Sequence, residues 1–150
     1  GRLISTNKES PGFQAKPTQA RLTEIAEGLY RVRRRREELM SGRFGADLFA
    51  DPAWDILLDL YVQNSRNEDV SVTQACTAAV VPVTTALRYI TVLADRGMIE
   101  RSKNPDDGRS YLLRLSAEAV QLMDEVLAGM APAGASAEDP LAAAAMFSRG

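Results

Sequence analysis

Apolar residues recur every three or four positions over five segments of this chain, and they alternate with polar residues over two short runs. The segments with helical spacing are, approximately, 18–41, 51–63, 71–79, 82–96 and 116–130. The alternating runs are 98–103 and 110–115. A period of three to four residues is that of an amphipathic helix, whereas a period of two is that of a half-buried strand. The pattern predicts a mainly α-helical chain with one small β-hairpin.

Local signals in the middle of the chain mark where two short helices begin and end. Ser71 and Gln74 have the spacing of a capping box, in which each side chain satisfies a backbone N–H group. The pattern then breaks at Val80, and Pro82 suits the first turn of a new helix, where its missing N–H costs nothing. Gly97 follows where a left-handed residue would end that helix. Two short helices joined by a tight turn predict a helix-turn-helix.

The segment Asn-Pro-Asp-Asp-Gly-Arg at 104–109 joins the two alternating runs. Asp107-Gly108 between such runs is a hairpin-turn signal. A helix-turn-helix followed directly by a hairpin is a winged helix-turn-helix, and the usual work of this arrangement is to bind duplex DNA. We therefore expect the helix at about 82–96 to enter the major groove and the hairpin at about 98–115 to act as a wing.

Six polar residues of this unit are candidates for contact with DNA: Thr84, Thr85, Arg88, Thr91, Lys103 and Arg109. Arg88 is the candidate for contacting bases, because its guanidinium matches O6 and N7 of guanine. Thr84 and Thr85, near the helix N-terminus, suit phosphate or a thymine methyl group. Arg109 suits a narrow minor groove. Lys103 suits phosphates, as does Arg101 on the same strand. The alternatives are an ordinary solvated helix face and a hairpin-tip ion pair of Arg109 with Asp107.

The charge of the chain supports this interpretation only when it is divided by segment. The net charge is −2 and the pI about 5.2, which is not typical of a nucleic-acid-binding protein. However, residues 82–115 carry +2, whereas residues 46–81 carry −5. This separation is what a DNA-facing side and a remote acidic side would produce.

The first predicted helix is long for a small domain and carries an apolar seam. The residues of the seam are Leu22, Ile25, Leu29, Val32 and Leu39. Either the rest of the domain or a second copy of the chain must bury them. Residues 18–130 thus form one predicted domain, between a flexible N-terminal arm at 1–17 and an alanine-rich tail at 131–150 that we expect to be disordered.

Two charged features near this helix have several interpretations. Five arginines lie at Arg31 and 33–36, and they can pair with neighbouring glutamates, meet the acidic second helix or contact phosphate. Asp51, Asp55 and Asp59 recur every four residues, which would suit a metal site or acid–base chemistry. The chain has no histidine, the commonest general base and transition-metal ligand, and Asp51 is already explained as a helix cap. We therefore expect no enzyme activity, no cofactor and no metal.

Cys76 is the one cysteine, so the chain can form no internal disulfide, which fits a reducing, cytoplasmic environment. It lies among small residues, where it is either an inert packing residue or a redox switch. No apolar run approaches the length of a membrane span, and no signal peptide is visible.

The order of elements resembles the multiple-antibiotic-resistance regulator (MarR) family of bacterial transcription factors over about residues 18–130. The resemblance rests on the sequences at 81–88, 93–99 and 104–109, which look like the family's recognition helix, helix end and wing tip. It implies an obligate homodimer, paired through the first and last helices, that binds a pseudo-palindromic DNA site. Two features depart from the family pattern. Pro82-Val83 stands where a polar or basic residue is common, and Gly108 precedes a single wing-tip arginine.

These observations predict a bacterial transcription regulator with a winged helix-turn-helix and flanking dimerisation helices. One alternative is a winged helix that serves as a protein-interaction or dimerisation module without sequence-specific DNA binding. A third interpretation is a sensor of an unidentified small-molecule effector, held between the dimerisation helices and the DNA-binding unit. Trp54, Tyr61, Tyr89 and Met98 are its candidate lining residues, although each suits the core equally well.

Overall fold

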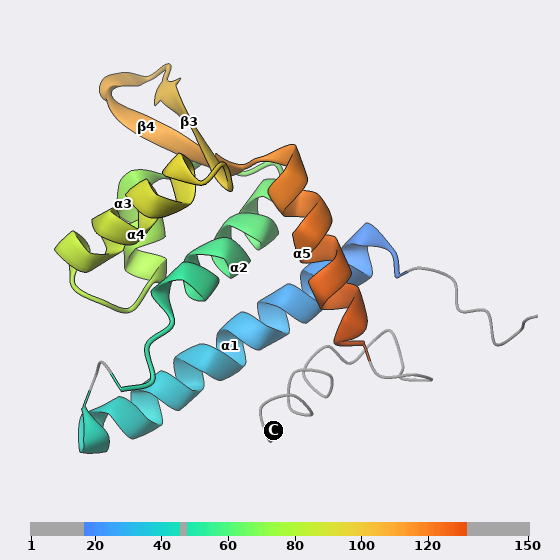
Figure 1. Cartoon of the computed structure of the whole chain (residues 1–150), viewed down its shortest axis with the longest axis vertical. Helices are drawn as coiled ribbons and strands as arrows, with labels where there is room; N and C mark the ends of the chain where they lie inside the picture. Colours follow the sequence, from blue (N-terminus) through green and yellow to red (C-terminus); the bar gives the residue numbers. More distant parts are fainter. Residues whose placement is uncertain (1–16, 46–47, 132–150) are drawn as a thin grey trace, which may run out of the picture.

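The computed structural model describes residues 17–45 and 48–131, which form five helices and three strands (Figure 1). In chain order these are α1 (Gln19–Phe44), α2 (Pro52–Ser65), β2 (Val70–Ser71), α3 (Val72–Ala78), α4 (Val83–Asp95), β3 (Ile99–Asn104), β4 (Asp107–Leu115) and α5 (Ala117–Gly129). The predicted fold class, mainly α with a small β wing, is confirmed. Apart from their innermost residues, the predicted arm at 1–17 and tail at 131–150 lie outside the described residues.

Four of the five described helices begin at a residue whose side chain caps the helix N-terminus. Thr18, Asp51, Ser71 and Ser116 each accept a hydrogen bond from a backbone N–H group in the first turn. The capping box is confirmed, since the Ser71 backbone N–H also donates to Gln74 Oε1 at 2.7 Å. These local bonds explain why most predicted helix starts agree with the structure to within one or two residues.

The helix-turn-helix consists of α3 and α4, whose axes are bent by 110° relative to each other, within the range of this motif. Val80 lies in the turn with φ of 57°, a left-handed conformation that is rare for a β-branched residue. Pro82 is the N-cap of α4 rather than a residue of its first turn, because its ψ of 147° is extended. Gly97 ends this unit in the left-handed conformation, with φ of 80°, as predicted.

The wing is an antiparallel sheet of strand order β2-β4-β3, in which Ile99 pairs with Leu115 and Lys103 with Tyr111. The predicted Asp107-Gly108 turn is wrong. The turn residues are Pro105 and Asp106, and Asn104 pairs with Asp107 across them. Proline sets the backbone angle that a turn needs, and Asn104 Oδ1 accepts from the Asp106 N–H at 3.0 Å. Gly108 therefore lies within β4.

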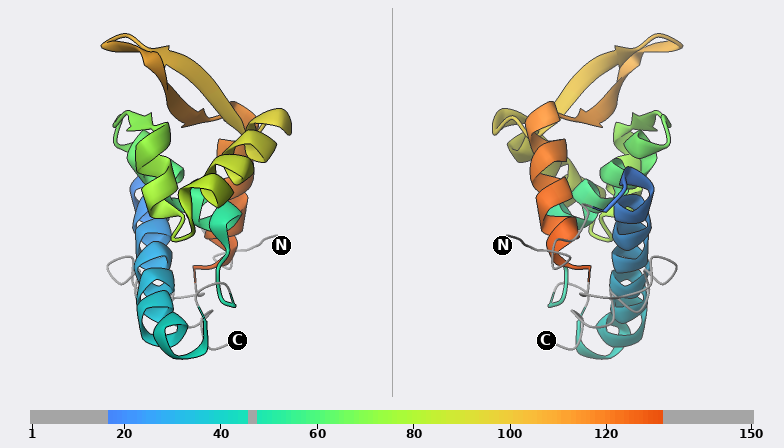
Figure 2. Two further views of the ribbon diagram at one scale, coloured as in Figure 1. Left: turned by 90° about the vertical axis from the view of Figure 1, so that its left-hand side faces the viewer. Right: turned by 90° about the vertical axis from the view of Figure 1, so that its right-hand side faces the viewer.

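The core lies between α1, α2, the helix-turn-helix and the base of the wing. Helix α5 crosses α1 near the N-terminal end of α1 (Figures 1 and 2). Leu22, Ile25 and Leu29 of the predicted seam are buried there. Leu39 is 58% exposed, because the C-terminal part of α1 projects beyond the other helices. Among the described residues no single helix has the length and apolar composition of a membrane span, although α3 and α4 satisfy these two criteria as a bent pair.

Candidate nucleic-acid interface

The outer face of α4 carries the polar side chains that the sequence singled out. Its inner face is held by Ala86, Ile90 and Leu93, which are buried in the core. The structure leaves Thr84, Arg88 and Thr91 exposed and Thr85 half-buried. The left view of Figure 2 shows α4 lying across the front of the domain, below the hairpin. The face is therefore accessible along its length.

The N-terminus of α4 differs from those of the other four described helices, because no side chain caps it. Its first turn also contains no acidic residue. The first backbone N–H groups of a helix have no partner within it, and the helix dipole adds a partial positive charge there. Such an end is suited to a phosphate group.

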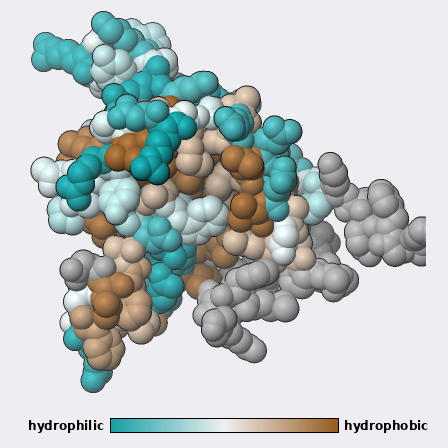
Figure 3. All heavy atoms as spheres, in the orientation of Figure 1, coloured by the Kyte–Doolittle hydropathy of each residue, from teal (hydrophilic) through white to brown (hydrophobic). Residues whose placement is uncertain are grey.

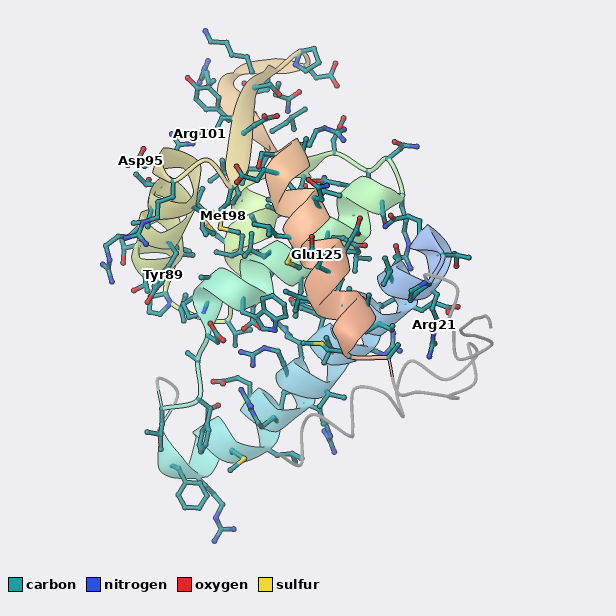
Figure 4. All side chains as sticks on the ribbon, turned by 45° about the vertical axis from the view of Figure 1, so that its right-hand side comes forward. Arg21, Tyr89, Asp95, Met98, Arg101 and Glu125 are labelled. Atoms are coloured by element: carbon teal, nitrogen blue, oxygen red, sulfur yellow. The ribbon has the colours of Figure 1, made fainter. Side chains whose placement is uncertain are left out.

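One face of the hairpin packs on the core at the end nearest the helices. Further along the hairpin, the same face carries basic side chains. Ile99, Arg101 and Lys103 alternate along β3 and so share this face. Arg101 donates a hydrogen bond of 3.4 Å to Thr91 Oγ1 on α4, and Figure 4 shows it at the base of the wing, near the end of α4 that carries Asp95. The wing and α4 thus form one continuous surface.

Arg101 joins the six candidate residues at this surface, as a second cation suited to phosphates beside Lys103. The alternation of Ile99, Arg101 and Lys103 in the sequence predicts that the two cations share a face, but it does not predict that this face approaches α4. Arg101 is exposed, like Lys103, and its contact with Thr91 brings its guanidinium beside the outer face of α4.

Arg109 lies near the wing tip and is exposed, as predicted. Asp107 Oδ1 accepts a hydrogen bond of 3.1 Å from the backbone N–H of Arg109. Asp107 therefore orders the backbone of the tip. Across the hairpin Lys103 pairs with Tyr111, whose ring is also exposed.

The five arginines at 31 and 33–36 of α1 have partners on α1, α2 or the segment between them and do not belong to this surface. Arg33 forms a buried salt bridge with Asp55 of α2. Arg34 lies over the Tyr30 ring at 5.8 Å, and Arg36 donates to the Phe49 carbonyl oxygen at 3.1 Å. The remaining two pair with glutamates, Arg31 with Glu27 and Arg35 with Glu38.

The row of aspartates on α2 is structural. Burial raises the pKa of Asp55, against the opposing effect of its hydrogen bond and ion pair with Arg33. Burial also raises the pKa of Asp59, while Asp51 caps the helix. Within residues 17–45 and 48–131, no group of histidine, cysteine or acidic side chains is arranged to hold a metal ion.

A polar cavity of about 340 Å³ lies between α1, α2 and α3, and its lining residues include Arg34, Asp59 and Thr77. The four predicted ligand-lining residues lie elsewhere. Tyr61 is buried beside a separate cavity of about 200 Å³. Trp54, Tyr89 and Met98 are partly buried against the core.

Cys76 packs in the core from α3 and is 5% exposed. Burial raises the pKa of its thiol. A protonated, inaccessible thiol reacts slowly, because the thiolate is the reactive form. The structure therefore favours the packing role over the redox switch.

No family model matches the chain, and neither does any curated protein. Solved structures with a similar fold include a probable transcriptional regulator from Pseudomonas aeruginosa, with 25% sequence identity and a TM-score of 0.44 over 81% of this chain and 92% of that one. FabT from Streptococcus pneumoniae, solved in complex with DNA, has 19% identity and a TM-score of 0.45 over 88% and 93%. A cysteine-to-serine mutant of MarR from E. coli has 15% identity and a TM-score of 0.45 over 91% and 98%.

Proposed function

We propose that this chain is a transcription regulator that binds duplex DNA as a homodimer, with α4 in the major groove and the hairpin against the neighbouring backbone. The observation that carries the proposal is one continuous surface. It combines the uncapped N-terminus of α4, the exposed Arg88, and Arg101 and Lys103 of the wing. A helix of this exposure with a basic hairpin beside it is the arrangement by which winged helices bind DNA.

The residues of this surface divide into two groups by their chemistry. Arg88 projects from the middle of α4 and contacts a guanine in the groove, where a guanidinium can make two parallel hydrogen bonds. Thr84, Thr85 and the uncapped backbone N–H groups contact phosphate, and this fixes how deeply the helix enters. Thr91 Oγ1 accepts a hydrogen bond from Arg101 and so holds this guanidinium toward the DNA backbone.

The wing supplies the second set of contacts. Lys103 contributes charge along the phosphates, and Arg109 enters the minor groove, whose negative potential is strongest where A·T pairs narrow it. These contacts account for most of the affinity, whereas the contacts of α4 account for the sequence preference.

The homodimer is supported by apolar surface that the described part of the chain leaves uncovered. It comprises Leu39, Phe44 and Leu48 at the projecting end of α1, and Leu122 and Val126 on α5. Figure 3 shows apolar side chains gathered on that projecting end. A second copy would bury them and place two α4 helices about 34 Å apart, which is one turn of DNA.

Charge reversal at Arg88 tests the proposal. Arg88→Glu should abolish binding to a duplex enriched from a random-sequence library, while its circular dichroism spectrum and unfolding midpoint stay those of the original chain. Arg114→Glu is the matched control, since Arg114 pairs with Glu100 and so lies on the opposite face of the hairpin from Arg101. Unchanged affinity of Arg88→Glu would contradict the assignment of α4, and loss of affinity in both variants alike would point to net charge alone.

A further inference from the structure

The outer face of α4 also carries apolar side chains that no contact within the described chain explains. Val83 is 61% exposed and Leu87 is 40% exposed. They stand four residues apart in one row, which continues to Thr91, and the neighbouring row contains Thr84 and Arg88. The two apolar residues therefore lie on the same face as the polar residues and close to the helix N-terminus.

In the major groove the C5-methyl group of thymine is the apolar group on the base edges. Valine and leucine have no hydrogen-bond donor or acceptor in their side chains, so neither can bind the polar edges of guanine, cytosine or adenine. Contact with a methyl group removes apolar surface of both partners from water, which is favourable. The N-terminal residues of a recognition helix are those that approach the base edges.

We propose that Val83 and Leu87 determine sequence specificity by contacting thymine methyl groups beside the guanine that Arg88 contacts. This inference rests on the proposed function and deepens it, because it names bases of the DNA sequence that the protein binds.

Charge around the patch favours DNA over a protein as its occupant. Arg88 lies next to Leu87, Arg101 reaches the same helix face at Thr91, and the first turn of α4 has no acidic residue. A small apolar patch with a cationic rim and a helix N-terminus fits a polyanion that carries isolated methyl groups. An apolar protein surface would leave these cations without counter-charges.

The test uses a site enriched from a random-sequence duplex library by the full chain. This site is then resynthesised with uracil in place of each thymine in turn, which removes one methyl group and no hydrogen-bonding group. At one or more positions the affinity should fall about threefold to fivefold, the factor expected for losing one buried methyl group. At the other thymines it should not change.

Variants connect the effect to the two side chains. Val83→Ala or Leu87→Ala should weaken binding to the thymine duplex and bind thymine and uracil equally well at the affected position. Val92→Ala is the matched control, because Val92 is 38% exposed on the same helix but lies near its C-terminal end. It should keep the full discrimination.

The outcomes separate this inference from the proposed function. Enrichment of a site whose affinity is indifferent to every uracil substitution would overturn the inference and leave DNA binding intact. Discrimination that persists in both alanine variants would also overturn it. No salt-dependent binding to any duplex would overturn both, and the apolar patch would then belong to a protein interface.

Discussion

Arg33 of α1 and Asp55 of α2 form a salt bridge inside the domain, with side chains that are 15% and 8% exposed. This pair joins the two charged features that stand out in the sequence, the arginine-rich stretch of α1 and the row of aspartates on α2. Each feature alone resembles a binding site. Together they form a structural contact between the two helices.

Removal of one partner should therefore destabilise the domain strongly. Arg33→Ala leaves the Asp55 carboxylate buried without its counter-charge, and we expect the free energy of unfolding to fall by about 3–5 kcal/mol in urea titrations. Arg35→Ala is the matched control, since Arg35 and Glu38 pair at the surface, and it should change stability by less than about 1 kcal/mol. Equal effects of the two variants would contradict the buried contact.

Asp59 should make the domain less stable as pH rises. Burial raises its pKa in the folded state, so the folded chain holds this proton more tightly than the unfolded chain. The associated stability is complete below the unfolded pKa and is lost as pH rises through the folded pKa. Asp59→Asn should therefore unfold at higher denaturant concentration than the original chain at pH 7 and at the same concentration near pH 3. If Asp59→Asn raised the denaturant midpoint by the same amount at both pH values, titration of Asp59 would not be the cause.

Val80 is a site where a smaller residue should stabilise the fold. Its left-handed backbone costs an L-residue about 1–2 kcal/mol, and glycine avoids this cost while it loses more entropy on folding. We expect Val80→Gly to raise the free energy of unfolding by about 1 kcal/mol. Val81→Gly should do the opposite, because Val81 packs against the core and its φ is not positive. Destabilisation by both variants would show that the turn is not strained.

Arg101 should contribute to DNA binding through charge. If it contacts a phosphate, Arg101→Ala should weaken binding by a similar factor for every duplex sequence and make the slope of log affinity against log salt shallower by about 1 per chain. Arg114→Ala, on the opposite face of the hairpin, should leave the slope unchanged. A change of slope in the control alone would place the DNA on the other face.

Elements fixed by local interactions could be predicted from the sequence. Helix starts followed from residues that bond to their own first turn, such as Ser71 and Asp51, and the end of α4 followed from Gly97. The exposed polar face of α4 followed from helical periodicity alone. Each of these signals depends on residues no more than about four positions apart.

Features that depend on distant residues could not be predicted. Arg33 and Asp55 are 22 positions apart, so the sequence left three interpretations of the arginines open. The wing turn is a local feature that the sequence still predicts wrongly, because two turn signals compete within six residues. Asp107-Gly108 is a strong signal, but Pro105 and the side chain of Asn104 form the turn two residues earlier. The role of Arg101 depends on the approach of β3 to α4, which the strand pattern does not specify.

The most direct test of DNA binding is titration of the chain against random genomic duplex at several salt concentrations, with its mass in solution recorded alongside. Arg101 and Lys103, the two exposed cations that the account assigns to phosphates, predict a dimer whose log affinity falls with log salt with a slope of about −2 per chain. A monomer with no measurable binding at low salt would contradict the account and favour a winged helix that binds other proteins.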